Sequence, residues 1–320
     1  MTFFVLATDQ VDERGLATLV ESGEFTVELI DDSSSEEFAQ ALSGAHALIV
    51  RSSTKVDVAM IGAAPELRVI GRAGVGVDNI DVEAASQRGI AVFNAPSGNT
   101  VAAAELTMAM ILALVRRVVE ADHTVRQGKW DRWKFQGVEL EGRTLGLIGA
   151  GRVGGEVATR AQSFGMEVIV YDPYLTEARA KEIGFRLTDL DDVLENADII
   201  SVHVPLTAET EGLVGAEALS TMKSDAYLVN AARGGVIDET ALAEALAAGS
   251  IAGAALDVYE VEPLPADSPL RQAPNLMMTP HIGASTIDAQ VRVAAEVAER
   301  IEQALTTGDV SAALNAADLV

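Results

Sequence analysis

The fold is decided by the stretch LGLIGAGRVG, residues 145–154. Its apolar first half predicts a buried strand, and its glycines then follow the spacing G-x-G-x-x-G into a predicted helix. In this pattern Gly149 permits a tight turn, Gly151 lets backbone amides approach a phosphate, and Gly154 lets the helix pack against the sheet. The helix N-terminus offers free N–H groups and a partial positive charge to a pyrophosphate. Glycine-rich turns also occur in ordinary loops, so the motif alone leaves that alternative open.

The segment after the motif favours a dinucleotide as the ligand. The next apolar strand ends at Tyr171, and Asp172 follows it, 18 residues beyond Gly154. An acid at this point accepts hydrogen bonds from both hydroxyls of an adenosine ribose and repels a 2′-phosphate. Residues 173–175 contain no arginine that would bind such a phosphate. We therefore predict NAD rather than NADP as the cofactor, the alternative being an acid that only caps the next turn.

Apolar segments on both sides of the motif predict an α/β protein with two doubly wound parallel-sheet domains. Short apolar runs alternate with helical stretches in the N-terminal third and again from Thr144 onward, which is typical of parallel sheets covered on both faces. The predicted strands cover residues 3–7, 27–30, 47–50, 69–70, 91–93, 145–148, 167–171, 199–202, 227–229 and 254–256. The clearest predicted helices cover residues 12–22, 35–43, 102–119, 239–248 and 288–305.

The composition is that of a soluble globular protein of about two domains. The chain has 320 residues, of which 49% are hydrophobic and 22% charged. It contains no cysteine, which excludes disulfides, thiol catalysis and thiolate metal sites. No apolar run is long enough to cross a bilayer, and the first residues lack the basic flank and cleavage signal of a secretory leader. We therefore expect a cytoplasmic protein with no membrane partner.

The formal net charge of −25 argues against nucleic acid as a partner, because phosphate backbones bind clustered lysine and arginine. The simpler interpretation of this acidity is a solvated surface. The alternative is adaptation to high salt, because lysine occurs only at Lys55, Lys129, Lys134, Lys181 and Lys223. A protein that is equally stable in dilute buffer and in molar salt would exclude this alternative.

Four histidines are candidates for proton transfer. Hydride transfer from a secondary alcohol requires a base for the hydroxyl proton, a group that orients the base, and a cation for the substrate carboxylate. His46 lies in an apolar strand and is predicted to be structural, and His123 belongs to the polar side of a helix. His203 follows a strand and could line a cleft. His281 lies in the turn-rich run TPHIGAST at residues 279–286, where it is either the catalytic base or a helix cap.

Two further loops carry charged residues after predicted strands. The run NAARGG at residues 230–235 places Arg233 at the carboxyl end of a strand, where open α/β sheets bind ligands. Its guanidinium suits a planar carboxylate, although a surface arginine before a Gly-Gly turn is the alternative. The run LDVYEVEP at residues 256–263 offers three carboxylates, and the sequence does not choose between them.

These motifs resemble those of the D-isomer-specific 2-hydroxyacid dehydrogenases. Four motifs follow in the family's order: GAGRVG at 149–154, NAARGG at 230–235, ALDV at 255–258 with EP at 262–263, and PHIGAST at 280–286. Four more stretches resemble the members that oxidise 3-phosphoglycerate: RSSTK at 51–55, GRAGVGVDN at 71–79, NAPSGN at 94–99 and GKWDR at 128–132. The resemblance therefore covers essentially the whole chain.

The resemblance implies a Rossmann-type NAD-binding domain at residues 97–285. This domain would be inserted in a flavodoxin-like substrate-binding domain formed by residues 1–96 and 286–320. Members of the family are typically dimers through the cofactor domain. We therefore expect a homodimer or higher homo-oligomer, and the apolar helix at 102–119 with the two tryptophans after it suits such an interface.

Carried over residue by residue, the resemblance also implies a site. His281 would be the acid/base, Glu262 its carboxylate partner and Arg233 the cation for the substrate carboxylate, while Asp257 would hydrogen-bond the nicotinamide carboxamide. No metal is expected. The implied cofactor-binding residues are Gly149, Gly151, Arg152, Val153, Gly154, Asp172, Ala231, Ala232, Arg233, Asp257, His281, Gly283 and Ala284. The implied residues for the substrate, 3-phosphoglycerate, are Arg51, Ser52, Arg72, Gly74, Asn99 and, from a second subunit, Arg132.

Two other functions stay open. A related enzyme that reduces glyoxylate or hydroxypyruvate would keep His281 and its partners but would not need the arginines at 51, 72 and 132. A non-enzymatic NAD sensor, similar to the co-repressors of the family, could retain the same residues, and only an assay separates it. Val75 and Val204 stand where many relatives have threonine, so a hydroxyl contact to the cofactor is missing or replaced by backbone. Longer relatives continue past residue 320 into domains that bind serine, so we expect no feedback by serine from these residues.

Overall fold

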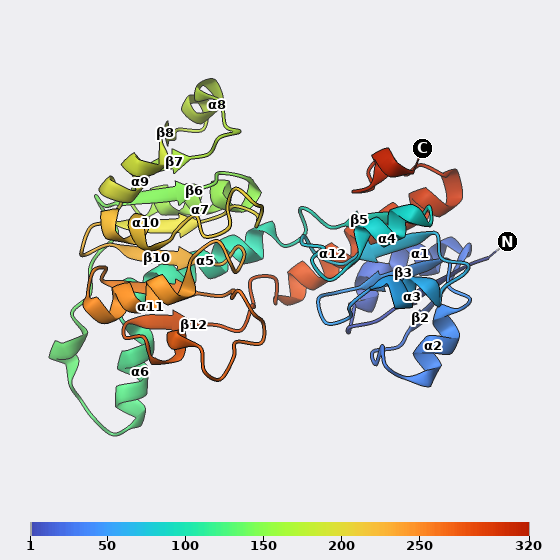
Figure 1. The fold of residues 1–320 in the computed structure, drawn as a ribbon, viewed down its shortest axis with the longest axis horizontal. Coiled ribbons are helices and arrows are strands. Elements are labelled where there is room, and N and C mark those ends of the chain that lie inside the picture. Colours follow the sequence, from blue (N-terminus) through green and yellow to red (C-terminus); the bar gives the residue numbers. More distant parts are fainter. Residues whose placement is uncertain (1, 320) are drawn as a thin grey trace. The chain divides into compact units, whose positions relative to one another are not determined.

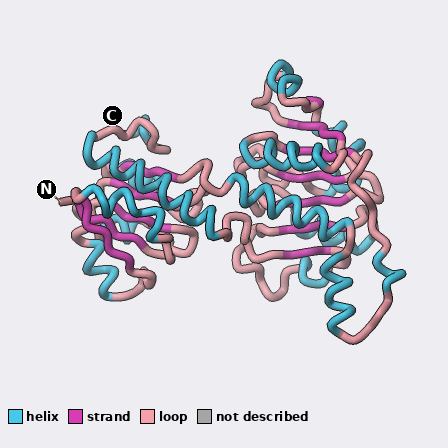
Figure 2. The backbone as a smooth tube through the Cα atoms, turned by 180° about the vertical axis from the view of Figure 1, so that it is seen from behind, coloured by secondary structure: helices cyan, strands magenta, loops and turns pink. Residues whose placement is uncertain are grey.

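The computed structural model describes residues 2–319 and divides into two compact units (Figure 1). Unit 1 comprises the residues up to Thr100 and those from Ala284 onward, and unit 2 comprises Val101–Gly283. The expected boundaries, after residues 96 and 285, differ from these by four and two residues. In each unit the strands lie side by side with helices on both faces (Figure 2).

The sheet of unit 1 has five parallel strands in the order β2-β1-β3-β4-β5. This is the flavodoxin-like order, and its direction reverses between β1 and β3. The predicted fold of this part is therefore confirmed. The strands are β1 Phe3–Ala7, β2 Phe25–Leu29, β3 Ala47–Val50, β4 Val69–Arg72 and β5 Ala91–Asn94.

The central strand β3 is a continuous apolar run because both faces of the sheet are covered. Along β3, Ala47 and Ile49 join one apolar cluster, whereas Leu48 and Val50 join another. All four side chains are buried. Side chains alternate between the two faces of a strand, so each face of this sheet has its own core.

Helix α12, Ile287–Thr307, covers one face of the unit 1 sheet. Its contact is close: a Cβ at Gly71 of β4 would collide with Val297. The single helix predicted for residues 12–22 is a 3-10 turn (η1, Glu13–Leu16) followed by the short helix α1, Ala17–Ser22. The other helices of this unit are α2 Glu36–Leu42, α3 Val58–Gly62, α4 Val82–Gln87 and the 3-10 turn η4 Ala316–Asp318.

Asn315 closes the edge of this sheet at β5. Its Oδ1 accepts a hydrogen bond from Val92 N at 2.9 Å, and its Nδ2 donates to Ile90 O at 2.9 Å. These two backbone groups lie on the same edge of the strand, so the amide takes the place that a neighbouring strand would fill. Unpaired strand edges are sites of aggregation, and Asn315 leaves these two backbone groups of the edge paired.

The sheet of unit 2 has seven parallel strands in the order β12-β11-β10-β9-β6-β7-β8. Counted from β6, the first six follow the Rossmann order 3-2-1-4-5-6, and the direction reverses between β6 and β9. The predicted fold is confirmed, but β8 and β12 were not predicted. The strands are β6 Thr144–Ile148, β7 Glu167–Tyr171, β8 Arg186–Leu187, β9 Ile199–Val202, β10 Tyr227–Asn230, β11 Gly253–Leu256 and β12 Leu276–Met278.

The long helix predicted at 102–119 is two helices, α5 Thr100–Val115 and α6 Val118–Arg126. Arg117 between them adopts φ 53°, a left-handed conformation that ends a helix. The carbonyl of Val115 accepts a hydrogen bond from Val138 N instead of continuing the helix. The remaining helices of this unit are α7 Arg152–Ser163, α8 Glu177–Glu182, α9 Leu190–Asn196, α10 Ala216–Thr221, α11 Glu239–Ala248 and the 3-10 turns η2 Arg132–Phe135 and η3 Pro269–Gln272.

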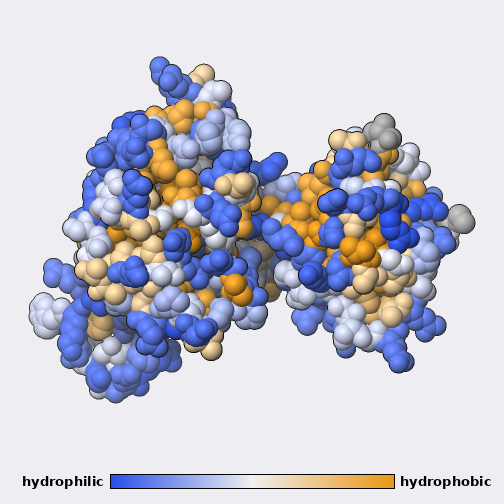
Figure 3. All heavy atoms as spheres, viewed as in Figure 1, coloured by the Kyte–Doolittle hydropathy of each residue, from blue (hydrophilic) through white to orange (hydrophobic). Residues whose placement is uncertain are grey.

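The surface of each unit is largely hydrophilic on the face shown in Figure 3. Within residues 2–319, no helix combines the length and apolarity needed to cross a membrane.

Candidate active site

The glycine turn after β6 is shaped by close backbone contacts. Gly149 has φ 93°, a conformation that side chains disfavour, and a Cβ there would lie 2.8 Å from the His203 carbonyl oxygen. A Cβ at Gly154 would collide with the carbonyl oxygen of Gly149. The residue before α7, Gly151, supplies no side-chain cap and has open space around it. The first amides of α7 can therefore receive a pyrophosphate, so the turn fits a dinucleotide.

Asp172 lies at the end of β7 beside this turn, as predicted. Its Oδ2 accepts a hydrogen bond from Ala150 N at 2.9 Å, and its Oδ1 accepts one from Tyr174 N at 2.9 Å. The acid thus connects β7 to the glycine turn, a contact that the sequence did not predict. Each carboxylate oxygen has a second lone pair, which leaves acceptors for ribose hydroxyls.

His203 follows β9 and lies under the glycine turn. Its carbonyl approaches Gly149, its Cβ lies 3.4 Å from where a Cβ at Gly154 would be, and its Nε2 shares a hydrogen bond of 2.8 Å with Ser201 Oγ. Burial lowers the pKa of His203 to about 4. The imidazole is therefore neutral at neutral pH and adds no charge to the turn.

Three neighbouring strands, β10, β11 and β12, bring the remaining candidates of unit 2 to one edge. Arg233 follows β10, Asp257 and Glu262 follow β11, and His281 follows β12. The strands are parallel and adjacent, so their carboxyl ends meet at the same edge of the sheet. Topology alone therefore gathers residues that are up to 48 positions apart in the sequence.

His281 pairs with Glu262. The distance between His281 Nδ1 and Glu262 Oε2 is 2.7 Å, and the histidine side chain is 46% exposed. His281 has φ 52°, and such left-handed conformations often occur where a loop fixes a functional side chain. Of the three carboxylates that the sequence left open, Glu262 is the partner of the histidine.

The environment of Glu262 favours its anionic form. Burial acts to raise the pKa of Glu262, but the hydrogen bonds from His281 and from Tyr259 N, together with the charges of His281 and Arg233, outweigh it and lower the pKa. The Tyr259 N–H donates to Glu262 Oε1 at 3.0 Å. The structure therefore brings Arg233, Glu262 and His281 together.

Asn230 shapes the loop that carries Arg233. Its Oδ1 accepts a hydrogen bond from Ala232 N at 2.9 Å, and its Nδ2 donates to Arg233 O at 2.8 Å. Asn230 itself is buried. The two alanines predicted at the cofactor, Ala231 and Ala232, belong to this same short loop.

Asp257 anchors the loop of His281. Its carboxylate is fully buried, and Oδ1 accepts hydrogen bonds from Thr279 Oγ1 at 2.6 Å and from Ile282 N at 2.8 Å. Its Oδ2 accepts one from Gly283 N at 2.8 Å. The sequence did not predict this contact; the signal was present only as an acid after one strand and a glycine after the next.

In unit 1, Arg51 follows β3 at the point where the strand order reverses. Asp9, after β1, holds its loop: the Asp9 carboxylate accepts hydrogen bonds from Arg51 N, Thr54 N and Thr54 Oγ1 at 2.7–3.0 Å. The Arg51 guanidinium donates to Asp9 O at 3.1 Å, and Asn79 Nδ2 donates to the carbonyls of Arg51 and Thr54. Asp9 and Asn79 were not predicted as part of this site.

Arg72 lies at the end of β4, next to β3, so the two arginines share one edge of the sheet. A Cβ at Gly74 would collide with the Arg72 guanidinium, so this glycine makes room for the arginine. Ser52 is exposed in the Arg51 loop. The Oδ1 of Asn99, ahead of α5, is buried without a hydrogen-bond partner.

The other predicted residues are placed as follows. Arg132 belongs to unit 2, where it is exposed and lies 4.6 Å from the centre of the Trp133 ring. Ala284 begins the second part of unit 1, and its carbonyl accepts a hydrogen bond from Gln290 Nε2. His46 accepts a hydrogen bond from Phe4 N at 3.0 Å, which fits its predicted structural role. His123 is exposed on α6, as expected for a polar helix face.

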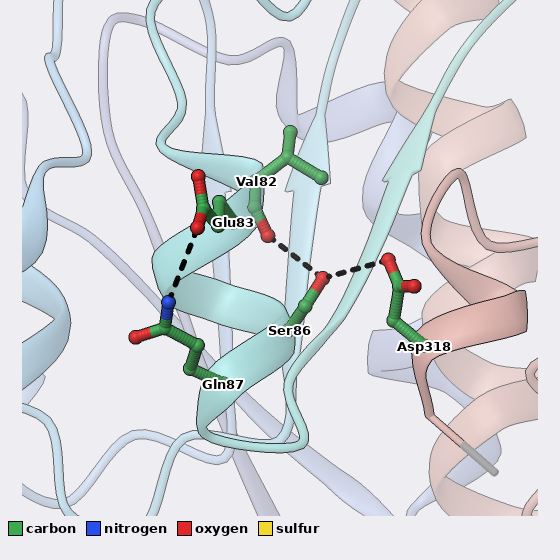
Figure 4. A pocket seen from close by; sticks show the side chains of 5 residues that line it. All are labelled: Val82, Glu83, Ser86, Gln87 and Asp318. Carbon is green, nitrogen blue, oxygen red and sulfur yellow. Dashed lines mark hydrogen bonds between the residues drawn. The ribbon is translucent and has the colours of Figure 1, made fainter.

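Two open hollows on unit 1, of about 500 and 460 Å³, contain none of the predicted site residues. The larger is lined by α4 and Asp318, where Ser86 Oγ donates to Val82 O (Figure 4). Ser86 Oγ also accepts a hydrogen bond from Asn315 Nδ2, so this hollow adjoins the contact that closes the edge of β5. Among residues 2–319, no group of three or more histidine, aspartate and glutamate side chains is arranged to hold a metal ion.

Residues 108–283 match the family described as D-isomer specific 2-hydroxyacid dehydrogenase, NAD binding domain. The match covers more than half of the chain and nearly all of unit 2. It includes the glycine turn and the loops of Arg233, Glu262 and His281.

Comparison with known proteins extends this match to the whole chain. The chain is 49% identical over 297 residues to the D-3-phosphoglycerate dehydrogenase of Archaeoglobus fulgidus, a region that is 93% of this chain and 56% of that protein. The chain spans a little over half the length of the curated relatives it matches.

Solved structures show the same similarity. The TT0316 protein from Thermus thermophilus is 38% identical with a TM-score of 0.85, over 95% of this chain and 97% of that one. The D-lactate dehydrogenase from Aquifex aeolicus, solved with NAD and lactic acid, is 31% identical with a TM-score of 0.81, over 96% and 97% of the two chains. The chain belongs to the D-isomer-specific 2-hydroxyacid dehydrogenase family, and residues 108–283 form its NAD-binding domain.

Proposed function

We propose that this protein is an NAD-dependent dehydrogenase that oxidises 3-phosphoglycerate to 3-phosphohydroxypyruvate, a step of serine biosynthesis. The observation that carries the proposal is the 2.7 Å hydrogen bond between His281 Nδ1 and Glu262 Oε2, formed near Arg233 in the unit with the glycine turn. Oxidation of a 2-hydroxy acid requires a histidine that is oriented by a carboxylate, and a guanidinium beside it that binds the substrate carboxylate. The relative from Archaeoglobus fulgidus is named for this activity.

The proton chemistry belongs to His281. With its Nδ1 proton held by Glu262, the imidazole presents a lone pair at Nε2, which takes the proton of the substrate hydroxyl as the C–H hydride leaves. The nicotinamide ring, when bound, supplies the acceptor for that hydride. Glu262 stabilises the imidazolium that forms, and its lowered pKa keeps it anionic for this task. The products are the 2-oxo acid, NADH and a proton that His281 releases.

The other site residues of unit 2 bind and orient the substrate and the cofactor. Arg233 holds the substrate carboxylate through its planar fork of donors. Asp257 offers the remaining lone pair of Oδ2 to the nicotinamide carboxamide, and Asp172 accepts the ribose hydroxyls. The pyrophosphate is held at the start of α7, at Arg152 and Val153, and the short loops around Ala231, Ala232, Gly283 and Ala284 cover the nicotinamide side.

The phosphate of the substrate is bound by arginines. Arg51 and Arg72 lie on the carboxyl edge of the unit 1 sheet, which is the edge where open α/β sheets bind their ligands. Ser52, Gly74 and Asn99 complete the substrate residues, and Arg132 joins them from a second subunit. Several guanidinium groups suit a doubly charged ligand on a protein with a net charge of −25.

A homodimer or higher homo-oligomer through unit 2 is part of the proposal. Trp130 and Trp133 are 79% and 83% exposed, and Val118 and Val119 of α6 are half-exposed. Exposed apolar patches of this kind are typical of association surfaces. Light scattering of the protein and of a Trp133→Ser variant tests this part. We also propose a cytoplasmic location, which cell fractionation tests.

The test of the activity is reduction of NAD at alkaline pH, followed by the ultraviolet absorbance of NADH. The proposal expects turnover with 3-phosphoglycerate well above that with lactate, glycerate and 2-hydroxyglutarate. The reverse reaction with glyoxylate and hydroxypyruvate separates the related reductases. Faster turnover of those unphosphorylated oxo acids would contradict the substrate, and no turnover at all would contradict the enzyme.

A further inference from the structure

The peptide bond between Tyr259 and Glu260 is packed against the segment that follows Arg233 on its carbonyl side and hydrogen-bonded to it on its amide side. On the carbonyl side, a Cβ at Gly234 would collide with Tyr259 O, so only a glycine permits this approach. On the amide side, Glu239 Oε1 accepts a hydrogen bond from Glu260 N at 2.6 Å. The segment from Gly234 to Glu239 therefore fixes the position of this single peptide unit.

Tyr259, whose carbonyl belongs to this peptide unit, is linked to both members of the histidine–carboxylate pair through its own N–H and its phenol. The N–H of Tyr259 donates to Glu262 Oε1 at 3.0 Å. The phenol of Tyr259 donates to Thr279 O at 2.8 Å, and Thr279 O also accepts the backbone N–H of His281 at 3.1 Å. A displacement of Tyr259 would consequently move the anchor of Glu262 and an anchor of the His281 loop together.

Glu239 has a partner outside its own helix. It is the first residue of α11, whose N-cap is Asp238, and acids are common in a first turn because they favour the helix dipole. That role does not require the bond to Glu260 N. The side chain is half-buried and faces the carboxylates of Glu260, Asp238 and Glu262; burial, and then their negative charge, raises the pKa of Glu239, although the Glu260 N–H opposes the shift.

We propose that Glu239 is a positioning residue for the acid/base pair, acting through its hydrogen bond to the Glu260 amide. This inference rests on the proposed function of His281 and Glu262. The carboxylate keeps the Tyr259–Glu260 peptide against Gly234. Tyr259 is thereby fixed, and its own N–H keeps Glu262 in place beside His281 Nδ1. Glu239 itself touches neither substrate nor cofactor.

The charge and the hydrogen bond of Glu239 can be separated. Glu262 faces His281, Arg233, the Tyr259 N–H and, through its charge, Glu239. Removal of the charge alone should leave the pair in place, because an oxygen still accepts the Glu260 N–H. Removal of the acceptor should disturb the pair itself.

Three variants separate these effects. Glu239→Gln keeps an oxygen that accepts the Glu260 N–H but has no charge, and Glu239→Ala removes both. Glu244→Ala, an exposed acid on the same helix, is the matched control. We expect kcat to fall by about tenfold in Glu239→Ala with the KM for NAD nearly unchanged. Glu239→Gln should retain most of the rate, and Glu244→Ala should be indistinguishable from the parent protein.

The ring resonances of His281, measured by NMR without substrate, give a readout that does not need turnover. We expect them to shift in Glu239→Ala, because the hydrogen bond between the ring and Glu262 is disturbed, and to stay close to those of the parent protein in Glu239→Gln. An unchanged kcat and unchanged ring resonances in Glu239→Ala, or an equal loss of kcat in both Glu239 variants, would overturn the proposal. If the parent protein shows no turnover of any 2-hydroxy acid, the proposed function fails, while the ring resonances still decide whether Glu239 positions the pair.

Discussion

The two sheets of this protein reverse their strand order at equivalent places but offer different hydrogen-bond donors there. In unit 2 the reversal lies between β6 and β9, where Gly149 and a neutral His203 leave backbone amides at the start of α7 without a side-chain cap. In unit 1 the reversal lies between β1 and β3, where the Asp9 carboxylate accepts hydrogen bonds from the backbone N–H groups of Arg51 and Thr54. One place offers backbone N–H groups, and the other offers a guanidinium.

This difference shows that topology provides the location and the residues choose the ligand. Bare amides at a helix N-terminus suit the extended pyrophosphate of a dinucleotide. A loop whose amides are already bonded to Asp9 presents the Arg51 side chain instead, which suits a compact anion. This contrast supports our proposal that unit 2 binds the cofactor and unit 1 the substrate phosphate, and the predictions below test it.

The largest expected effect separates chemistry from binding within unit 2. Because we propose that His281 transfers the proton, and it does not shape the glycine turn, His281→Ala should lower kcat by about 10³-fold. The Kd for NADH, measured by its fluorescence, should stay nearly unchanged. A parallel loss of NADH affinity would show that the His281 side chain supports cofactor binding and would contradict a role confined to proton transfer.

The next effect tests whether the backbone amides at the start of α7 bind the cofactor. Gly154→Ala should push α7 away from the Gly149 carbonyl and weaken NADH binding by about 10- to 100-fold. Gly155→Ala is the matched control, because a Cβ at Gly155 meets no atom within 4 Å. Equal affinities of the two variants for NADH would contradict the role of the close approach at Gly154.

A smaller effect tests whether the Arg51 guanidinium in unit 1 binds the substrate phosphate. Arg51→Ala should raise the KM for 3-phosphoglycerate by about 10- to 30-fold, as expected for the loss of charge-assisted hydrogen bonds. The KM values for unphosphorylated 2-hydroxy acids and for NAD should change little. If all three KM values rise together, Arg51 does not bind the phosphate.

The smallest effect concerns the neutral histidine at the unit 2 reversal. The unfolded chain protonates His203 below its ordinary pKa of about 6.5, whereas the folded protein does so only near its lowered pKa of about 4. Folding stability is therefore lost as the pH falls from 6.5 towards 4. Urea unfolding at about pH 7 and pH 5 should show a loss of about 1–2 kcal/mol that disappears in His203→Gln. The same pH dependence in both proteins would assign the loss to other groups.

Most of the fold could be predicted from the sequence. Apolar runs such as 47–50 and the glycine spacing at 149–154 depend on local residues, and the observed strand orders confirmed both fold classes. The split of α5 from α6 could not be predicted, because residues 102–119 are apolar or helix-forming throughout and the break depends on a contact between Val115 and Val138. Strands β8 and β12 have two and three residues. These are too few for a pattern of apolar residues to be recognised in the sequence.

The site could be predicted in its parts but not in its connections. A histidine, an arginine and three carboxylates after strands were evident. The residues alone did not choose between the carboxylates, the family resemblance implied Glu262, and the folded chain shows the hydrogen bond between Glu262 and His281. The contacts that fix these side chains join distant residues: Asp9 reaches Arg51 across 42 positions, and Asp257 reaches Ile282 across 25. No local pattern marks such contacts, because they depend on which strand ends become neighbours.

The most direct test of the account is a double-mutant cycle of His281→Ala and Glu262→Ala, with kcat for oxidation of 3-phosphoglycerate as the readout. If the carboxylate acts only through the imidazole, the double variant should be no slower than His281→Ala alone. Losses that multiply, so that removal of Glu262 slows the enzyme further when His281 is already absent, would show that the two residues do not function as a pair.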